Sequence, residues 1–468
     1  MSDGYENTRH DNAIRDHTVN PLENRKVYIK TLGCKVNTFD SRVLENQFRA
    51  KGYEIIGSPE HADIQIINSC SVTANAEREA RYLLRRFQRE NPKSVRVITG
   101  CYAQIHSSQL QDLAEVDYVV PNEVKHDLIA LLEGKLHNAS SAKLPAEVKA
   151  VSKNRQSQFK SSVVVFDEAI SDQTRAYLKV QDGCDGFCAY CQIPYARGAS
   201  RSVPPQQVLT EVRRLIQHGV PELVVTGIHV GDYGRDLSQA EDNSPFVELL
   251  QSIFAEKGLR QLRISSLEPS EVNEPLLKML KDHEVQFCDH FHLPLQSGSD
   301  RILKLMRRSY TTTQYAETVS MIRSYFPKIH ISGDVIVGFP QEGEEEFAQT
   351  QDFIQSLHFG SLHVFPYSKR PNTLAEKLPG HMAPEIIKLR VRILRELSTQ
   401  LYRTYAAQFL DQTLSVLWEN QTDTQGRLLG KTKNYLNICA PRNADTQAGS
   451  ISSLCIRGFV DEKTLLAT

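Results

Sequence analysis

Short apolar runs alternate with amphipathic segments over the first part of the chain. The apolar runs cover residues 26–33, 62–69 and 95–100, and each has the length of a buried parallel strand. Segments with a helical spacing of apolar residues lie between them, and this alternation is typical of an α/β unit. The pattern therefore predicts an N-terminal α/β domain with a parallel sheet over residues 25–134.

The same alternation returns later in the chain and occurs six times. The predicted strands cover residues 176–181, 222–227, 262–266, 291–295, 330–338 and 362–367. Helical segments separate them, and six βα units in a row are typical of an open or partial parallel barrel. We assign this barrel to residues 175–405, in which a long helical stretch begins near residue 384.

Three further segments lack this alternation. Residues 1–24 are polar and predict a disordered tail, and residues 135–174 are largely rich in Ser, Ala, Lys and Asn, which predicts a linker. Residues 406–468 hold short strand-like runs with turn residues between them, which indicates a small all-β module. The predicted fold class is therefore α/β, with a parallel-sheet N-terminal domain, a central partial (βα)6 barrel and a C-terminal small β-barrel.

Composition and charge narrow the function classes. The chain has 468 residues and a formal net charge of −1, so a nucleic-acid site would have to be a local basic patch. The N-terminal residues lack the apolar core of a signal peptide, and no apolar run approaches the ~18 residues of a membrane span. We therefore expect a soluble cytoplasmic protein without a membrane partner. Nine cysteines in a reducing compartment favour metal binding or catalysis over disulfides.

Three of the cysteines lie close together in the stretch GCDGFCAYC, as Cys184, Cys188 and Cys191. A structural zinc site and an ordinary cubane iron–sulfur cluster both take four ligands, so this set leaves one corner open. The stretch directly follows the first predicted barrel strand, and the active sites of parallel barrels lie at the carboxyl ends of strands. The position favours a catalytic metal centre, with a structural zinc ion as the alternative.

Three other cysteines are distant in the sequence but share a position relative to the predicted sheet. Cys34, Cys70 and Cys101 each stand at or just beyond the end of an N-terminal strand. The carboxyl ends of parallel strands converge at one edge of a sheet, so the three thiols could meet at one point. Buried, inert cysteines explain the spacing alone equally well. Burial as small hydrophobic residues is also the better interpretation of the remaining three, Cys288, Cys439 and Cys455.

The close set of cysteines, with Tyr190 before the third, resembles the signature of the radical S-adenosylmethionine enzymes. The resemblance implies that Cys184, Cys188 and Cys191 hold a 4Fe-4S cluster, and that S-adenosylmethionine chelates its open iron through its amino and carboxylate groups. An electron from the cluster then cleaves the sulfonium to give a 5′-deoxyadenosyl radical. The resemblance therefore makes these three residues both metal ligands and catalytic residues.

Longer motifs resemble one subfamily of these enzymes, the methylthiotransferases. They are TLGCKVNTFDS, NSCSVTANAEREAR and TGCYAQ around the N-terminal cysteines, then RISSLEPSE, HLPLQSGSDRILKLMRRSYT, DVIVGFPQE and HVFPYSKRPNT. The resemblance implies that Cys34, Cys70 and Cys101 hold an auxiliary 4Fe-4S cluster. It implies two S-adenosylmethionine molecules, one for the radical and one to methylate sulfur. It further implies a TRAM-type RNA-binding barrel at residues 406–468 and a low-potential electron donor, a flavodoxin or a ferredoxin.

Contacts to the cofactor are carried over from the same resemblance. VVTG resembles the strand that holds the methionine amino group, IVGFP resembles the adenine-binding strand, and polar side chains follow two other strand ends. For each residue the alternative is a role in shaping a turn, or in supporting other residues that contact the cofactor. The chain has Gln341 where the family usually has glycine, so Glu342 is left out of the prediction. The predicted cofactor-binding residues are Tyr190, Thr226, Gly227, Glu268, Gln296 and Gly338.

Two segments are candidate RNA contacts. Residues 75–90 form a predicted helix in which arginines follow one face, shortly after Cys70. Arginine recognises phosphate well, although a solvated face is the common role of such a stripe. Basic and aromatic residues also gather at 426–437 in the predicted small barrel, where they suit a looped-out RNA strand. The candidates are Arg78, Arg81, Arg85, Lys431, Lys433 and Tyr435.

The motif at the first N-terminal cysteine also bears on the substrate. This chain has TLGCKVN, whereas family members that act on N6-isopentenyladenosine usually have TYGCQMN. TLGCKVN and NSCSVT resemble the MtaB-type branch, whose substrate is N6-threonylcarbamoyladenosine at position 37 of tRNA, next to the anticodon. The resemblance implies methylthiolation at C2 of that base in the anticodon stem-loop. Lys35 is a candidate partner for its threonyl carboxylate, and a solvent-facing lysine is the alternative.

Other functions stay open at this point. The same chemistry could act on N6-isopentenyladenosine in tRNA, or on a ribosomal protein, although TLGCKVN argues against the latter. The chain could also be a non-catalytic iron–sulfur protein that binds RNA, although binding alone does not need an open iron. The sequence predicts no oligomeric state.

Overall fold

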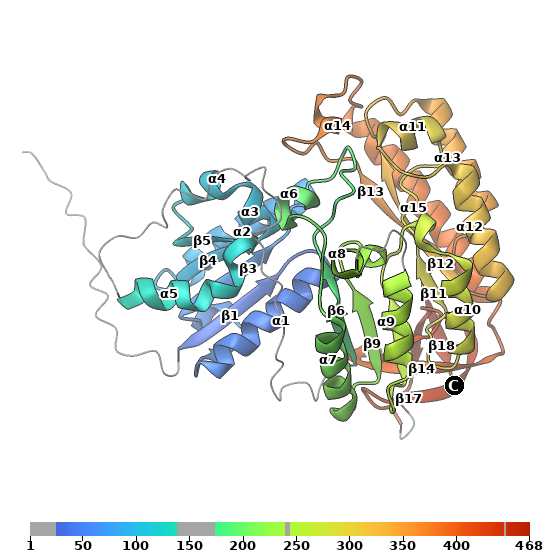
Figure 1. Ribbon diagram of the computed structural model, residues 1–468, viewed down its shortest axis with the longest axis horizontal. Helices are drawn as coiled ribbons and strands as arrows, with labels where there is room; N and C mark the ends of the chain where they lie inside the picture. The colour runs from blue at the N-terminus through green and yellow to red at the C-terminus, as the bar shows by residue number, and fades with distance from the viewer. Residues whose placement is uncertain (1–24, 138–173, 239–243, 444–445) are drawn as a thin grey trace, which may run out of the picture.

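The computed structural model describes residues 25–137, 174–238, 244–443 and 446–468 (Figure 1). The tail predicted for residues 1–24 and most of the predicted linker lie outside these ranges. Helix α5 (Leu128–His137) reaches a short way into the segment that composition assigns to the linker. Within the described ranges, no helix combines the length and the apolar character that a membrane crossing requires.

The N-terminal domain is built on a five-stranded parallel sheet with the order β2-β1-β3-β4-β5. The central strand β3 is buried at every position, including the polar residues Gln65, Asn68 and Ser69. Apolar clusters cover both faces of the sheet. The strands are β1 (Lys26–Thr31), β2 (Glu54–Ile55), β3 (Ile64–Ser69), β4 (Val95–Gly100) and β5 (Tyr118–Pro121), and the other helices are α1 (Lys35–Ala50), α2 (Ala74–Glu90), α3 (Cys101–Ile105) and α4 (Ser107–Gln111).

The central domain is the predicted open barrel of six parallel strands. Two three-stranded sheets, β6-β9-β10 and β11-β12-β13, are joined by parallel bridges between Leu262 and Phe287 and between Ser266 and His292. A large apolar core fills the space between the strands and their helices. The strands are β6 (Arg175–Lys179), β9 (Glu222–Thr226), β10 (Gln261–Ile264), β11 (His290–His292), β12 (His330–Val337) and β13 (Ser361–Pro366).

Helices cover the outside of this barrel, and short elements line its carboxyl edge. The longer helices are α7 (Pro205–Gln217), α9 (Ser244–Phe254), α10 (Glu274–Asp282), α12 (Thr312–Tyr325), α13 (Glu344–Ser356) and α15 (Pro384–Ala407). The short elements are β7 (Gln181–Asp182), α6 (Ile193–Arg197), β8 (Arg201–Ser202), α8 (Arg235–Ser238), α11 (Asp300–Leu305) and α14 (Leu374–Lys377).

The C-terminal domain is a closed five-stranded barrel, as the short strand-like runs predict. Its strands follow the order β14-β15-β16-β18-β17, and β14 pairs with β17 to close the ring. Tyr402, Tyr405 and Ala406 at the end of α15 pack into its core beside the buried Trp418. The strands are β14 (Thr413–Thr422), β15 (Leu428–Thr432), β16 (Asn437–Ala440), β17 (Ile451–Phe459) and β18 (Thr464–Ala467).

The N-terminal domain lies beside the open side of the central barrel (Figure 1). Helix α1 packs against β6, and α3 packs against α6. This arrangement brings the carboxyl edge of the N-terminal sheet next to the loop that follows β6. The two sets of cysteines therefore come from two domains but lie on either side of one interface.

Candidate active site

Three cysteines of the N-terminal sheet lie side by side at its carboxyl edge. Cys34 follows β1, Cys70 follows β3 and Cys101 begins α3 directly after β4, and these three strands are parallel neighbours. A Cβ atom added to Gly33 would lie 2.7 Å from Cys70 Sγ, so the turn before Cys34 touches the second cysteine. Gly33 has φ +98°, a conformation that favours glycine. The strand ends thus bring three sequence-distant thiols together.

The surroundings of these thiols suit metal-bound thiolates. Burial, together with the neighbouring Cys101 and Cys34, raises the pKa of the Cys70 thiol to about 12. The protein atoms around Cys34 also raise the pKa of its thiol, although the residue is exposed at the surface. The positive charge of Arg197 opposes this shift. A bound metal centre removes such protons because its charge stabilises the thiolate. Asn122 Nδ2 donates a hydrogen bond to Cys101 Sγ at 3.5 Å.

The second set of cysteines lies in the loop after β7, and an N–H group points at each of its sulfurs. The three bonds are Gly186 N to Cys184 Sγ (3.3 Å), Ile193 N to Cys191 Sγ (3.4 Å) and Arg308 Nη1 to Cys188 Sγ (3.1 Å). Burial, together with the neighbouring Cys188 and Cys184, raises the pKa of Cys191 to about 12. Hydrogen bonds to sulfur of this kind are a means by which proteins tune iron–sulfur clusters.

The spacing of the sulfurs favours a cluster over a single zinc ion. Thiolates 2.3 Å from one tetrahedral zinc ion would stand ~3.8 Å apart. Across the described part of the chain, His229, Asp232 and Glu271 form the only group of three candidate donor atoms within 4.8 Å of one another. In the described part of the chain no three cysteine sulfurs lie within 4.8 Å of one another, so neither set has the arrangement that a single zinc ion requires.

A cavity of about 210 Å³ lies between the two sets of cysteines. Residues 71–73, which follow Cys70, line one wall, and residues 190–193, which include Cys191, line another. Gln296, Asp334 and residues 365–368, from the carboxyl half of the barrel, also line it. The cavity thus touches both domains and the immediate surroundings of both cysteine sets.

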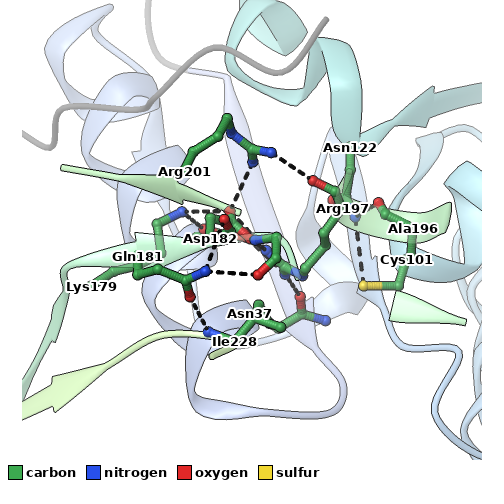
Figure 2. A network of polar contacts seen from close by, with 12 residues as sticks. Asn37, Cys101, Asn122, Lys179, Gln181, Asp182, Ala196, Arg197, Arg201 and Ile228 are labelled. Carbon is green, nitrogen blue, oxygen red and sulfur yellow. Dashed lines mark hydrogen bonds and ion pairs between the residues drawn. The ribbon is translucent and has the colours of Figure 1, made fainter. Parts of the chain in front are cut away.

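A buried polar network holds the two domains together beside this cavity. Arg197, at the end of α6, donates from Nη2 to Asn37 Oδ1 (2.6 Å) and pairs with Asp40 Oδ2 (3.1 Å), both on α1. Its Nη1 pairs with Asp182 at 3.0 Å. Figure 2 shows Arg197 among Asn37, Asp182 and Cys101, with Asn122 reaching both the Cys101 sulfur and the Ala196 carbonyl. The network fixes the position of one cysteine set relative to the other.

A second buried contact closes the far side of the cavity. Arg370 forms an ion pair with Glu77 of α2 and donates from Nε to Gln192 Oε1 at 3.2 Å. Gln192 Nε2 in turn donates to the Pro371 carbonyl at 2.8 Å. Arg370 is 4% exposed, so this pair is protected from solvent. It links α2, the loop of the second cysteine set and the segment after β13.

The predicted cofactor-binding residues divide into two groups. Tyr190 and Gln296 line the cavity, and Glu268 forms an ion pair with Arg308, the donor to Cys188. Thr226, Gly227 and Gly338 do not line it. Thr226 is buried, and Gly227 lies against the side chain of Gln181, which itself donates to the Gly183 carbonyl beside the cysteine loop. The Gly338 turn packs against Ile387 of α15, and its N–H donates to Glu342 at 3.2 Å.

Sequence reasoning did not find two groups of this site. Arg308 lies in the motif HLPLQSGSDRILKLMRRSYT but was not predicted as a site residue, because its partner Cys188 is far away in the chain and the motif does not indicate their contact. His229 was missed for the same reason: its Nδ1 lies 2.6 Å from Asp232 and its Nε2 lies 2.6 Å from Glu271, while Nδ1 is also 3.9 Å from Cys184 Sγ. The available signals were the motif that contains Arg308 and the position of His229 just after the end of β9.

The candidate RNA contacts lie in different surroundings. Arg78 and Arg85 are exposed on α2, and Arg85 pairs with Glu115 at 3.4 Å. Arg81 donates to Tyr102 Oη at 2.5 Å. Lys431, Lys433 and Tyr435 are half-buried between the small barrel and the central barrel: Lys433 Nζ donates to the carbonyls of Glu284 and Val285, Tyr435 stacks on His290, and Lys431 lies over the Tyr435 ring. An RNA strand would have to displace domain contacts to reach these three.

Comparisons with known proteins agree with this architecture. Residues 26–121 match the uncharacterized protein family UPF0004, and residues 178–354 match the radical SAM superfamily. The solved structure of the radical S-adenosylmethionine methyltransferase TsrM from Kitasatospora setae is similar with a TM-score of 0.54 at 14% identity, over 73% of each chain, which shows a shared fold.

Curated relatives are similar over almost the whole chain. The threonylcarbamoyladenosine tRNA methylthiotransferase MtaB of Aquifex aeolicus (strain VF5) is 38% identical over 88% of this chain and 96% of its own length. The tRNA-2-methylthio-N(6)-dimethylallyladenosine synthase of Protochlamydia amoebophila (strain UWE25) is 31% identical over 94% of this chain and 96% of its own. The chain therefore belongs to the radical S-adenosylmethionine methylthiotransferase family, whose members use S-adenosylmethionine and 4Fe-4S clusters.

Proposed function

We propose that the protein attaches a methylthio group to C2 of N6-threonylcarbamoyladenosine at position 37 of tRNA, next to the anticodon. The product is 2-methylthio-N6-threonylcarbamoyladenosine. The observation that carries the proposal is that one cavity between two domains is lined by Cys191 of one cysteine set and by residues 71–73, which directly follow Cys70 of the other set. The name of the Aquifex aeolicus relative supports this choice of substrate. We place the reaction in the cytoplasm, with a flavodoxin or a ferredoxin as electron donor.

The target bond explains the need for two centres. The aromatic C2–H bond of adenine offers no proton that a protein base could usefully remove, so a radical is needed. When bound, the two clusters and S-adenosylmethionine supply the electrons, the 5′-deoxyadenosyl radical and the sulfur. Cys184, Cys188 and Cys191 would hold the radical S-adenosylmethionine cluster. The N-terminal set, Cys34, Cys70 and Cys101, would hold the auxiliary cluster.

Other residues of the chain bind the cofactor or the substrate, or hold the cysteines and the two domains in position. Tyr190 and Gln296 line the cavity and are placed to contact the cofactor or the substrate base. Arg308 holds the Cys188 sulfur through its N–H group and is itself fixed by Glu268. The Arg197–Asp40 and Arg370–Glu77 pairs hold the domains at a constant separation. The remaining predicted contacts, Thr226, Gly227 and Gly338, would act from behind the cavity wall.

Lys35 is proposed to select the substrate. It directly follows Cys34 and opens α1, and its charge interacts with Asp334, which lines the cavity. Burial lowers the pKa of its amine, and Arg263 lowers it further. A lowered pKa means that burial disfavours the charged ammonium. A carboxylate from the threonyl group would offset this effect by pairing with the ammonium. Lys35→Met should therefore weaken the preference for carbamoylated tRNA, whereas Lys30→Met on β1 should not; equal preference in both variants would contradict this role.

RNA contact is proposed for the exposed arginines of α2, Arg78 and Arg85, with Arg81 behind them. The same role at Lys431, Lys433 and Tyr435 would require the small barrel to move away from the central barrel, because these side chains are engaged there. The anticodon loop is a suitable substrate because an unpaired base leaves its stack more easily than a duplex base.

Methylthiolation of N6-isopentenyladenosine is the second candidate function. It is favoured by the 31% identity to the Protochlamydia amoebophila relative, which is named for the related dimethylallyl nucleoside. A non-catalytic iron–sulfur role in RNA binding is a third, and the open corner of both cysteine sets argues against it.

The proposal is tested by anaerobic reaction of the reconstituted chain with S-adenosylmethionine, a low-potential reductant and tRNA that carries N6-threonylcarbamoyladenosine. We expect 5′-deoxyadenosine and a nucleoside heavier by one methylthio group in place of hydrogen. Cys188→Ala should form neither, while Cys455→Ala should form both. Absence of 5′-deoxyadenosine from a fully loaded wild-type chain would leave only the non-catalytic function.

A further inference from the structure

Helix α15 carries a stripe of cations that the fold does not use. Lys388, Arg392 and Arg395 are exposed and follow one another at intervals of four and three residues, so they share one face over two turns. Within the described part of the chain, none of the three lies within ion-pair distance of a carboxylate. The opposite face of α15, with Leu394 and Leu397, packs into the core of the central barrel.

This stripe forms one wall of a groove. The groove has a volume of about 930 Å³ and lies between α15 and the start of α2, from which Asn75 and Arg78 contribute. Thr399 and Gln400 extend the α15 wall toward the small barrel, where Glu462 closes the groove. Two helices from different domains therefore present cations to the same concave surface.

The groove leads to the active-site cavity. Pro366 and Tyr367, at and after the end of β13, line both of them. A strand that lies in the groove can thus pass a base into the cavity without crossing the outer surface of the barrel. Tyr82, one turn beyond Arg78 on α2, is 60% exposed and offers an aromatic face beside this path.

Charge indicates the chemistry of the occupant. Four cations line the groove, namely Arg78, Lys388, Arg392 and Arg395, against two carboxylates, Glu396 and Glu462. Cations three and four residues apart repel each other and weaken a helix, so their presence on α15 does not serve folding. Guanidinium groups match phosphate oxygens in geometry, and Thr and Asn side chains add neutral hydrogen bonds to a sugar–phosphate chain.

We propose that the groove between α2 and α15 binds the sugar–phosphate backbone of the substrate RNA and guides the target base into the cavity. The inference rests on the proposed function, because it assigns the path of that substrate. Contacts of this kind are independent of base sequence and set the position of the strand. An acidic electron-transfer protein is the other partner that such a groove could take, and continuity with the cavity favours RNA.

Binding of tRNA at several salt concentrations tests the proposal. Arg392→Gln/Arg395→Gln should lower the slope of log affinity against log salt by about two, since two phosphate contacts are lost. With equal affinities at 1 M salt, a slope difference of two corresponds to a roughly 40-fold weaker affinity at 150 mM salt. The charge reversal Arg392→Glu/Arg395→Glu should weaken binding further. Lys257→Glu/Lys278→Glu is the matched control, because it changes net charge equally on exposed positions outside the groove.

Iron content and thermal unfolding should be the same in all four proteins, and 5′-deoxyadenosine formation without RNA should persist. Wild-type affinity and slope in both groove variants would overturn the inference while leaving the proposed function intact. Loss of reduction by flavodoxin with tRNA binding unchanged would also overturn it, in favour of the electron-transfer partner. If the wild-type chain binds no tRNA, both the proposed function and the inference about the groove are overturned.

Discussion

Arg197 Nη2 lies 3.1 Å from Asp40 Oδ2, and this buried pair connects the two cysteine sets. Arg197 stands six residues after Cys191, and Asp40 stands six residues after Cys34. Each partner thus belongs to the segment that directly follows one of the cysteine sets. A movement of one domain relative to the other would have to break the pair, and the cavity between the sets would change with it.

Asp40→Asn should destabilise the interface strongly. Asp40 also pairs with Lys125 at 2.8 Å and Lys179 at 2.7 Å, so the substitution leaves three buried cations without their shared carboxylate. Breaking a buried pair from one side costs about 3–5 kcal/mol. Urea unfolding at pH 7 measures this loss. Asp112→Asn, an exposed carboxylate, is the control and should change stability by less than ~0.5 kcal/mol.

Lowering the pH should remove the contribution of Glu222, at the start of β9, to the free energy of unfolding. Burial raises the pKa of its carboxyl, but Arg263 and Arg175 outweigh burial and lower the pKa to about 2. A carboxyl whose pKa is lowered by folding stabilises the protein above its unfolded pKa, and this stabilisation is lost as pH falls toward its folded pKa. The free energy of unfolding should therefore fall by about 3 kcal/mol between about pH 4.5 and pH 2.

Urea unfolding of Glu222→Gln as a function of pH checks this expectation. The variant should be less stable than the wild type by about 3 kcal/mol at pH 7, and the difference should narrow below pH 4. Glu256→Gln removes the exposed pair with Arg213 and should change little at any pH. A constant gap between Glu222→Gln and the wild type from pH 7 to pH 3 would contradict the assignment.

Gly33→Ala should abolish the auxiliary centre and spare the other. The added Cβ would lie 2.7 Å from Cys70 Sγ, and φ +98° adds backbone strain. Gly52→Ala is a matched control, because Gly52 has φ +82° but nothing within 4 Å of an added Cβ. In both variants backbone strain should lower the free energy of unfolding by about 1 kcal/mol. Only Gly33→Ala should also lose about half of the iron that the wild type binds after reconstitution. Equal iron in the two would show that Gly33 does not shape the cluster site.

Cysteine variants should separate the two centres. Cys70→Ala should halve the iron content and keep 5′-deoxyadenosine formation, because the second set stays intact. Cys188→Ala should also halve the iron content but abolish 5′-deoxyadenosine. Cys455→Ala should change neither, since this cysteine lies on β17 of the small barrel. Iron analysis and chromatography of the nucleoside product measure both quantities, and identical behaviour of Cys70→Ala and Cys188→Ala would contradict two separate clusters.

The strand pattern predicted the architecture well, because buried parallel strands are continuous apolar runs bounded by turns. The positions of Cys34, Cys70 and Cys101 at strand ends allowed their convergence but did not decide between it and burial as inert cysteines. Side chains that act across domains were not predictable. The contacts of Arg308 and Arg197 could not be predicted from the local sequence, since their partners lie on other elements. The basic and aromatic residues at 426–437 suggested an RNA surface, yet three of them fill a domain interface, because composition does not tell which face of a strand is covered.

The most direct test is a competition between two tRNAs in a single anaerobic reaction, one with N6-threonylcarbamoyladenosine and one with N6-isopentenyladenosine at position 37. The reconstituted chain, S-adenosylmethionine and reductant are added, and the nucleosides are analysed by mass spectrometry. We predict the mass gain of methylthiolation on the threonylcarbamoyl nucleoside alone. A gain on the isopentenyl nucleoside alone, or 5′-deoxyadenosine with no gain on either tRNA, would contradict the proposed substrate.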